Sequence, residues 1–338
     1  MRVGLTAAST ALSAFFPPQI IPCSAHSQPG TRILAGGTTL YDLMKLGIET
    51  PAAVVDVHRL AELTDIRTDG AELVFGAGAR MSDVADHPVV RADYPALSES
   101  LWRAASQQLR NMATVGGNLL QRTRCAYFRG GVEFPCNKRS PGSGCAAIGG
   151  HDRTHALFGG SDLCIATYPG DWAIALLAFD ASVDVLGPGG ARTVPLSALH
   201  VEPGDDPTRE HTLSPDELIV RIRVPATAAG RASTYLKIRD RESYAFALAA
   251  AAVGLTLDAD GVVGECRIAL GGVATRPWRA TEAERDLVGK PLTTRSARHA
   301  GEVAFAGARP GNYNGFRVEL GIRTVADAIR IAGERASR

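Results

Sequence analysis

The stretch Arg32–Gly47, RILAGGTTLYDLMKLG, predicts a strand, a tight turn and a helix in succession. The first residues have the composition of a short strand, and the pair Gly36–Gly37 predicts a turn without Cβ atoms to obstruct a ligand. After the turn, Leu40, Leu43 and Met44 recur at helical spacing. A turn that exposes backbone N–H groups at a helix start favours a phosphate or pyrophosphate, although the pattern alone also fits a plain tight turn.

A second glycine pair lies in TVGGN, residues 114–118. It follows residues 94–112, YPALSESLWRAASQQLRNM, which we expect to form one amphipathic helix. Two glycine turns in one region are able to hold the two ends of a dinucleotide. A nicotinamide fingerprint is absent, because GAGARM has Met81 where the third glycine belongs.

Four of the six cysteines lie within one window of 40 residues: Cys125, Cys136, Cys145 and Cys164. The window lacks the closely spaced pair that is usual in structural zinc sites. Wide gaps suit an iron–sulfur cluster, whose corners are further apart than the ligands of one ion. Basic residues in the same window offset the negative charge of such a cluster. Four incidental thiols are the alternative, and His151 and His155 are alternative ligands or polar loop residues.

The chain has 338 residues, enough for about two domains, and a formal net charge of +1. This charge gives no electrostatic reason to expect binding to nucleic acid or to an anionic membrane. The longest uncharged apolar run, Tyr244–Leu257, is shorter than a membrane-spanning helix. Residues 1–30 have a weak similarity to a signal peptide, and an irregular segment explains them equally well.

The order of the predicted elements indicates an α+β fold. A hairpin is expected at residues 181–199 and an alternating strand at 216–225, before a small, flexible linker at Pro225–Arg231. Three strands follow, at residues 234–241, 244–258 and 262–273, and then two helical stretches, at 280–289 and 325–335. Strands followed by helices are typical of α+β proteins.

Several of these motifs together resemble the FAD subunit of the molybdenum hydroxylases, the xanthine dehydrogenase family. The similarity runs from about Arg32 to the C-terminus, in LAGGTTLYDLMK, QLRNMATVGGNLLQRTRC, CIATYPGD and ALGGVATRPWRA. The four-cysteine insertion, which most members lack, resembles the flavin subunit of bacterial three-subunit, periplasmic-type aldehyde oxidoreductases. Family members usually begin with a strand and helix close to F-x-Y-x-x-A, and residues 1–30 contain no such element.

The resemblance implies a two-lobed FAD-binding domain of the vanillyl-alcohol-oxidase type at residues 1–225, with a 4Fe–4S loop at 122–167. It implies a small α+β domain at 232–338, with a three-stranded antiparallel sheet and helices. The implied cluster ligands are Cys125, Cys136, Cys145 and Cys164. The implied FAD contacts are Leu34, Ala35, Gly36, Gly37, Thr38, Thr39, Leu40, Tyr41 and Asp42 at the pyrophosphate, then Thr114, Gly116, Gly117 and Asn118, then Asp171, and finally Ile219 and Lys237 near the flavin ring.

By the same resemblance the chain is an electron-transfer subunit with no catalytic side chain. A molybdenum-cofactor subunit oxidises an aldehyde or N-heterocycle, a 2Fe–2S subunit carries electrons to FAD, and an external acceptor removes them. We expect the complex in the cytoplasm or, exported folded with a partner's signal, in the periplasm. The alternatives are a stand-alone FAD-dependent oxidase or reductase and a non-enzymatic protein held by zinc.

Overall fold

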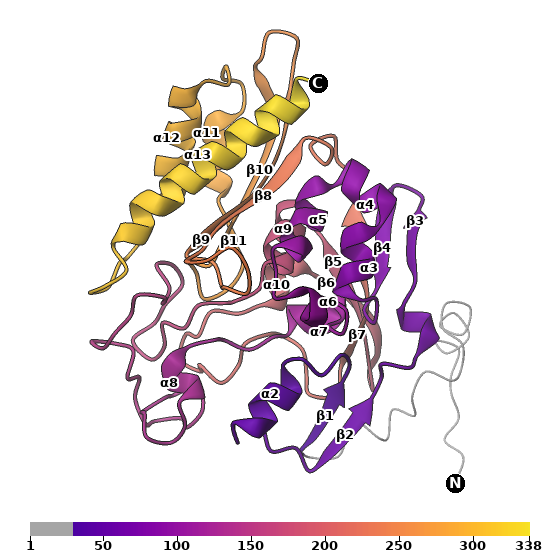
Figure 1. Ribbon diagram of the computed structural model, residues 1–338, viewed down its shortest axis with the longest axis vertical. Coiled ribbons are helices and arrows are strands. Elements are labelled where there is room, and N and C mark those ends of the chain that lie inside the picture. Colours follow the sequence, from indigo (N-terminus) through magenta and orange to yellow (C-terminus); the bar gives the residue numbers. More distant parts are fainter. Residues whose placement is uncertain (1–29) are drawn as a thin grey trace.

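The computed structural model describes residues 30–338, which form three β-sheets with helices packed around them. The expectations for the N-terminus, namely the signal-like segment and the missing F-x-Y-x-x-A element, lie on residues 1–29, outside the described residues. Figure 1 shows the strand-rich C-terminal part above the unit that carries β1, β2 and α2.

The first sheet confirms the predicted strand–turn–helix unit. Strands β1 (Thr31–Leu34) and β2 (Ala53–Asp56) pair in parallel, and helix α2 (Leu40–Lys45) connects them. Gly37 has a φ of +72°, a left-handed conformation that favours glycine. Thr39 is the N-cap residue of α2, and its side chain makes no capping hydrogen bond.

The second sheet is antiparallel and has the strand order β3-β4-β7-β5-β6. Its strands are β3 (Ile66–Asp69), β4 (Glu72–Gly76), β5 (Ser182–Gly187), β6 (Gly190–Pro195) and β7 (Leu218–Pro225). The hairpin of β5 and β6 is the one predicted from the sequence. The helical elements of this region are η2 (Ala61–Leu63), α3 (Met81–Asp86), α4 (Pro88–Asp93), α5 (Pro95–Trp102), α6 (Gln107–Arg110), α7 (Val115–Leu119), α8 (Ala126–Arg129), α9 (Trp172–Ala178) and α10 (Leu196–Leu199).

The single helix expected over residues 94–112 is wrong, because the chain forms two helices, α5 and α6. Ala105 between them has a φ of +48°, so the backbone leaves the helical region there. Ser106 then starts α6 by accepting a hydrogen bond from the backbone N–H of Leu109. The break turns the chain toward the second glycine pair.

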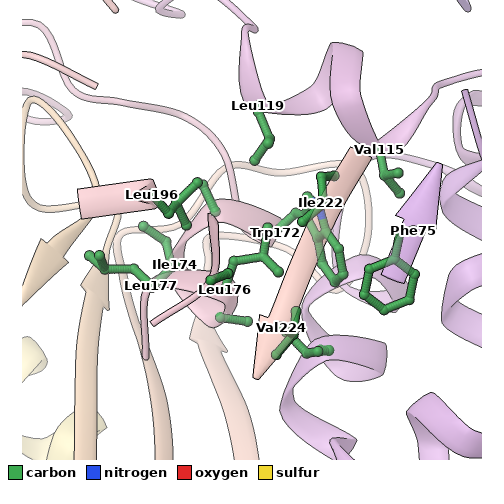
Figure 2. Packing of buried hydrophobic residues seen from close by; sticks show 14 of the residues in the cluster. Phe75, Val115, Leu119, Trp172, Ile174, Leu176, Leu177, Leu196, Ile222 and Val224 are labelled. Atoms are coloured by element: carbon green, nitrogen blue, oxygen red, sulfur yellow. The ribbon is translucent and has the colours of Figure 1, made fainter. Parts of the chain in front are cut away.

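Helix α9 lies at the centre of the main hydrophobic core, and all seven of its residues are buried. Figure 2 shows Trp172 of α9 among Phe75 of β4 and Ile222 and Val224 of β7. The rings of Phe75 and Trp172 meet edge to face, with centroids 5.6 Å apart. This core fixes β7 and α9, and both elements carry residues of the candidate site.

The C-terminal sheet is antiparallel, with the strand order β11-β10-β9-β8. Its three long strands are the predicted ones: β8 (Ser233–Ile238), β9 (Ala249–Leu257) and β10 (Val263–Gly271). The two-residue strand β11 (Trp278–Arg279) adds an edge that was not expected.

Three helices cover one face of this sheet, where the sequence predicted two (Figure 1). They are α11 (Thr281–Leu287), α12 (Thr294–Phe305) and α13 (Phe316–Ala336). Helix α12 was missed because its buried face consists largely of alanine and glycine, which recur at helical spacing but do not stand out as apolar residues in the sequence. Together these helices bury a second hydrophobic cluster against β9 and β10.

Candidate functional site

The structure contains an open groove of about 2070 Å³. Its walls come from the β1–α2 turn, the start of α7, the start of β7 and the segment after β8. Drug-sized ligands occupy pockets of about 300–1,000 Å³, so this groove has room for a larger, extended molecule. Of the 16 residues predicted to contact FAD, all line it: Leu34, Ala35, Gly36, Gly37, Thr38, Thr39, Leu40, Tyr41, Asp42, Thr114, Gly116, Gly117, Asn118, Asp171, Ile219 and Lys237.

The two glycine pairs, about 80 residues apart in sequence, meet in the groove. A Cβ atom on Gly36 would lie 2.0 Å from the carbonyl oxygen of Met112, just before the second pair. A Cβ atom on Gly116 would lie 2.6 Å from the Cβ of Ala77. Glycine is required at both positions because the backbones approach too closely for any side chain.

The turn before α2 offers unpaired backbone donors. Within residues 30–338, no hydrogen-bond partner is present for the backbone N–H groups of Gly36–Leu40. Successive N–H groups of this kind form a concavity that binds anions. The turn at the start of α7 differs, because the N–H of Gly117 donates to the Thr114 hydroxyl at 3.2 Å. The first glycine turn is therefore the better fit for a pyrophosphate.

Besides Nδ1 of His211, two polar side-chain atoms in the groove wall are buried without a partner among the described residues. One is Oδ1 of Asn118, whose Nδ2 lies 3.5 Å from the sulfur of Met81. The other is Nη1 of Arg129, whose Nη2 donates to Asp42 at 2.7 Å. Buried polar atoms are nearly always paired in proteins. A bound ligand with donors and acceptors in the groove would satisfy both, so the residues present fit FAD.

Asp171 and Lys237 form a buried ion pair at the inner wall of the groove. The Lys237 ammonium lies 2.8 Å from a carboxylate oxygen of Asp171 and also donates to the Arg103 carbonyl oxygen at 3.0 Å. The hydroxyl of Tyr235 donates to the other oxygen of Asp171 at 2.7 Å. Burial, together with this neighbouring carboxylate, raises the pKa of Tyr235 well above its ordinary value, so the phenol stays protonated.

Ile219 lies on β7 with its side chain buried in the groove wall. Tyr41, by contrast, is largely exposed at the rim. Several residues that were not predicted from the sequence also line the groove, among them Arg124, Arg241, Tyr244 and Phe246. Three of them come from the segment after β8, and no motif there marked them.

The four clustered cysteines come together at a second place, the loop that contains α8. All four line one small cavity, together with His155. The backbones of Cys136 and Cys145 form an isolated antiparallel β-bridge. Cys136 and Cys164 are buried. Burial raises the pKa of Cys125 to about 11, which favours the protonated thiol.

Side-chain hydrogen bonds hold this loop, which contains little regular structure. Asn137 donates to the Leu163 carbonyl oxygen at 3.1 Å and accepts from the N–H of Gly144 at 2.9 Å. Arg139 donates to the carbonyl oxygens of Tyr127 and Phe128 at 2.9 and 2.7 Å. These bonds bring the distant cysteines together, so the loop fits a cluster with four ligands.

Residues 30–338 contain no group of three or more His, Cys, Asp and Glu side chains placed to hold a metal ion. In the same range, no helix is both long enough and apolar enough to span a membrane.

Near the cysteines, burial opposes ionisation of Glu210, but Lys138 and Arg122 outweigh it and lower the pKa of this carboxyl.

Two family models match the chain. The FAD binding domain in molybdopterin dehydrogenase matches residues 21–227, and the CO dehydrogenase flavoprotein C-terminal domain matches residues 234–330. The first model covers more than half of the 338 residues.

Curated relatives agree with these models. The chain is 45% identical over 314 residues to the aldehyde oxidoreductase FAD-binding subunit PaoB of Escherichia coli, covering 93% of this chain and 95% of that one. It is 29% identical to the carbon monoxide dehydrogenase medium chain of Hydrogenophaga pseudoflava, covering 82% of this chain and 79% of that one.

The fold also matches a solved structure. A carbon monoxide dehydrogenase from Hydrogenophaga pseudoflava, lacking the Mo-pyranopterin moiety of its molybdenum cofactor, superposes with a TM-score of 0.70 at 27% identity, over 93% of this chain and 92% of that one. Family model, relatives and fold agree with the groove and its two glycine turns. The chain belongs to the molybdenum hydroxylase family as an FAD-binding subunit.

Proposed function

We propose that this chain is the electron-transfer subunit of a molybdenum-containing aldehyde or N-heterocycle oxidoreductase. Electrons from 2Fe–2S clusters of a partner subunit reach the FAD bound here and leave to an external acceptor. The observation that carries the proposal is the meeting of the two glycine turns beside five unpaired backbone N–H groups in the groove. The name of the 45%-identical relative supports the aldehyde class of substrate.

The residues of this chain bind and orient the cofactor. The N–H groups of Gly36–Leu40 would donate to the pyrophosphate, and the unpaired Oδ1 of Asn118 would accept from a hydroxyl or N–H group of FAD. The ion pair of Asp171 and Lys237 fixes the inner end of the groove. Bound FAD supplies a carrier that is stable with zero, one or two added electrons, so no side chain is required as an acid or base.

We further propose that Cys125, Cys136, Cys145 and Cys164 bind a 4Fe–4S cluster. Their common cavity and the hydrogen-bonded loop around it support this assignment. The domain division at residues 225 and 232 also stays a prediction, as does a location in the cytoplasm or, after export with a partner's signal, in the periplasm.

The test is an absorption spectrum with iron and acid-labile sulfide assays on the complex purified anaerobically. We expect flavin bands, a broad shoulder that dithionite bleaches, and about four irons per chain. Flavin without iron would refute the cluster assignment. The absence of both flavin and iron from a folded complex would refute both assignments. Turnover of an organic substrate by the isolated chain would favour a stand-alone flavin oxidase instead.

The variant Cys145→Ser tests the ligand set. We expect it to lose most of its iron, because a serine hydroxyl is a poor ligand for this kind of cluster. The matched control is Cys266→Ala, since Cys266 is buried in β10 and does not line the cysteine cavity. Wild-type iron content in Cys145→Ser would show that this cysteine is not a ligand.

A further inference from the structure

His155 faces the cysteine cavity with one ring nitrogen. Its Nε2 lies 3.2 Å from the sulfur of Cys125. The side chain is only 3% exposed, and Nδ1 is buried with no hydrogen-bond partner in the described part of the chain. Within residues 30–338, the Cys125 sulfur is therefore the one hydrogen-bonding contact of this ring.

The backbone of His155 is held from both sides. Its N–H donates to the Asp152 carbonyl oxygen at 2.8 Å. Its carbonyl oxygen accepts from Nη1 of Arg317 at 2.5 Å and from Nδ2 of Asn314 at 3.3 Å. These two donors belong to α13 and the segment just before it. The C-terminal helix thus sets the position of a residue in the cysteine loop.

Arg317 is suited to this task because its side chain is fully buried. Besides the His155 oxygen, its guanidinium donates to the carbonyl oxygens of Leu248 and Gly272. A planar guanidinium that bonds several carbonyl groups in fixed directions holds them in one arrangement. The carbonyl group of His155 is one of the groups held in this way. Because the backbone of His155 is fixed, its imidazole has little freedom to move away from the Cys125 sulfur.

The protonation state of a ligating cysteine determines which atom is the donor in the hydrogen bond between His155 and Cys125. A cysteine that ligates iron is a thiolate and has no proton to donate. The hydrogen must therefore belong to Nε2 of His155. A neutral imidazole protonated on Nε2 suffices, so the interaction requires no change in protonation state.

We propose that Nε2–H of His155 donates a hydrogen bond to the Cys125 sulfur and raises the reduction potential of the cluster. The inference rests on the 4Fe–4S assignment proposed above. Hydrogen bonds to cluster sulfurs favour the reduced state, which carries the additional negative charge. His155 is a positioning and tuning residue, and the four cysteines remain the iron ligands.

The test uses the complete complex and three variants, His155→Leu, His155→Gln and the control His151→Leu. His151 is exposed on the same loop and does not line the cysteine cavity. Iron and acid-labile sulfide are assayed, and the cluster is titrated potentiometrically with electron paramagnetic resonance as the readout. We expect His155→Leu to retain about four irons per chain with a more negative cluster potential.

His155→Gln should recover part of the shift, because an amide N–H also donates a hydrogen bond, and His151→Leu should match the wild type. An unchanged potential in His155→Leu with full iron content would overturn the inference and leave the cluster assignment intact. Loss of iron from both His155 variants would overturn it in favour of His155 as an iron ligand. A wild-type complex without iron would instead refute the cluster assignment itself.

Discussion

Gly36→Ala tests whether the approach of the two glycine turns is needed for FAD binding. The new Cβ atom would lie 2.0 Å from the Met112 carbonyl oxygen, and within 2.9 Å of the carbonyl carbon of Met112 and the Cα of Ala113. Ordinary contacts begin at 3.4 Å, so the two segments must separate by about 1.4 Å. All three atoms belong to backbone, and no side chain is able to rotate away.

A separation of this size moves the first turn away from the position that its ligand requires. The loss of one hydrogen bond to a charged group destabilises binding by about 1.5–3 kcal/mol. Since about 1.4 kcal/mol corresponds to a factor of ten, we expect the Kd of FAD to rise roughly 10- to 150-fold.

The assay is a fluorescence titration of FAD into the flavin-free protein. Circular dichroism and thermal unfolding of the same sample establish that Gly36→Ala is folded. The control is Gly189→Ala in the turn between β5 and β6, where a Cβ atom would have no neighbour within 4 Å. Wild-type affinity in a folded Gly36→Ala variant would refute the assignment of this turn to FAD.

Two further predictions concern buried charges. Lys237→Met leaves the Asp171 carboxylate buried without its cation, so we expect a loss of about 3–5 kcal/mol in the free energy of unfolding in a urea titration. The double variant with Asp171→Asn should recover part of that loss, and equal losses in both would contradict the pairing. Burial lowers the pKa of His200 to about 4, and its Nε2–H donates to the Leu119 carbonyl oxygen at 2.8 Å. Because the folded state resists protonation, stability should fall by about 3 kcal/mol as the pH drops from about 6.5 to 4, and a urea titration against pH should show a flatter profile in His200→Gln.

Local patterns predicted the parts of the fold that short-range chemistry determines. The first turn was predictable because Gly36–Gly37 lies between a short strand and a helical repeat. The four cysteines were predicted to be neighbours because they share one loop-like window, and they line one cavity. In both cases the residues that matter are close in sequence.

Features that depend on distant parts of the chain were not predictable. The break at Ala105 has no sequence signal, because alanine is a strong helix former and only its surroundings impose a positive φ. The contact of His155 with Cys125 depends on Arg317, 162 residues away. Pairing of Asp171 with Lys237 likewise joins the N-terminus of α9 to β8, and the two residues are 66 positions apart in the sequence.

Ion pairs connect the flavin groove to the cysteine loop. Helix α8 begins directly after Cys125, and its last residue, Arg129, donates to Asp42 on α2 at 2.7 Å. Arg122, three residues before Cys125, pairs with Glu49 at 2.6 Å. Both carboxylates lie in the segment that follows the first glycine turn. The loop that carries the cysteines is thus fixed to the segment that carries the pyrophosphate donors, so the geometry of one site constrains the other.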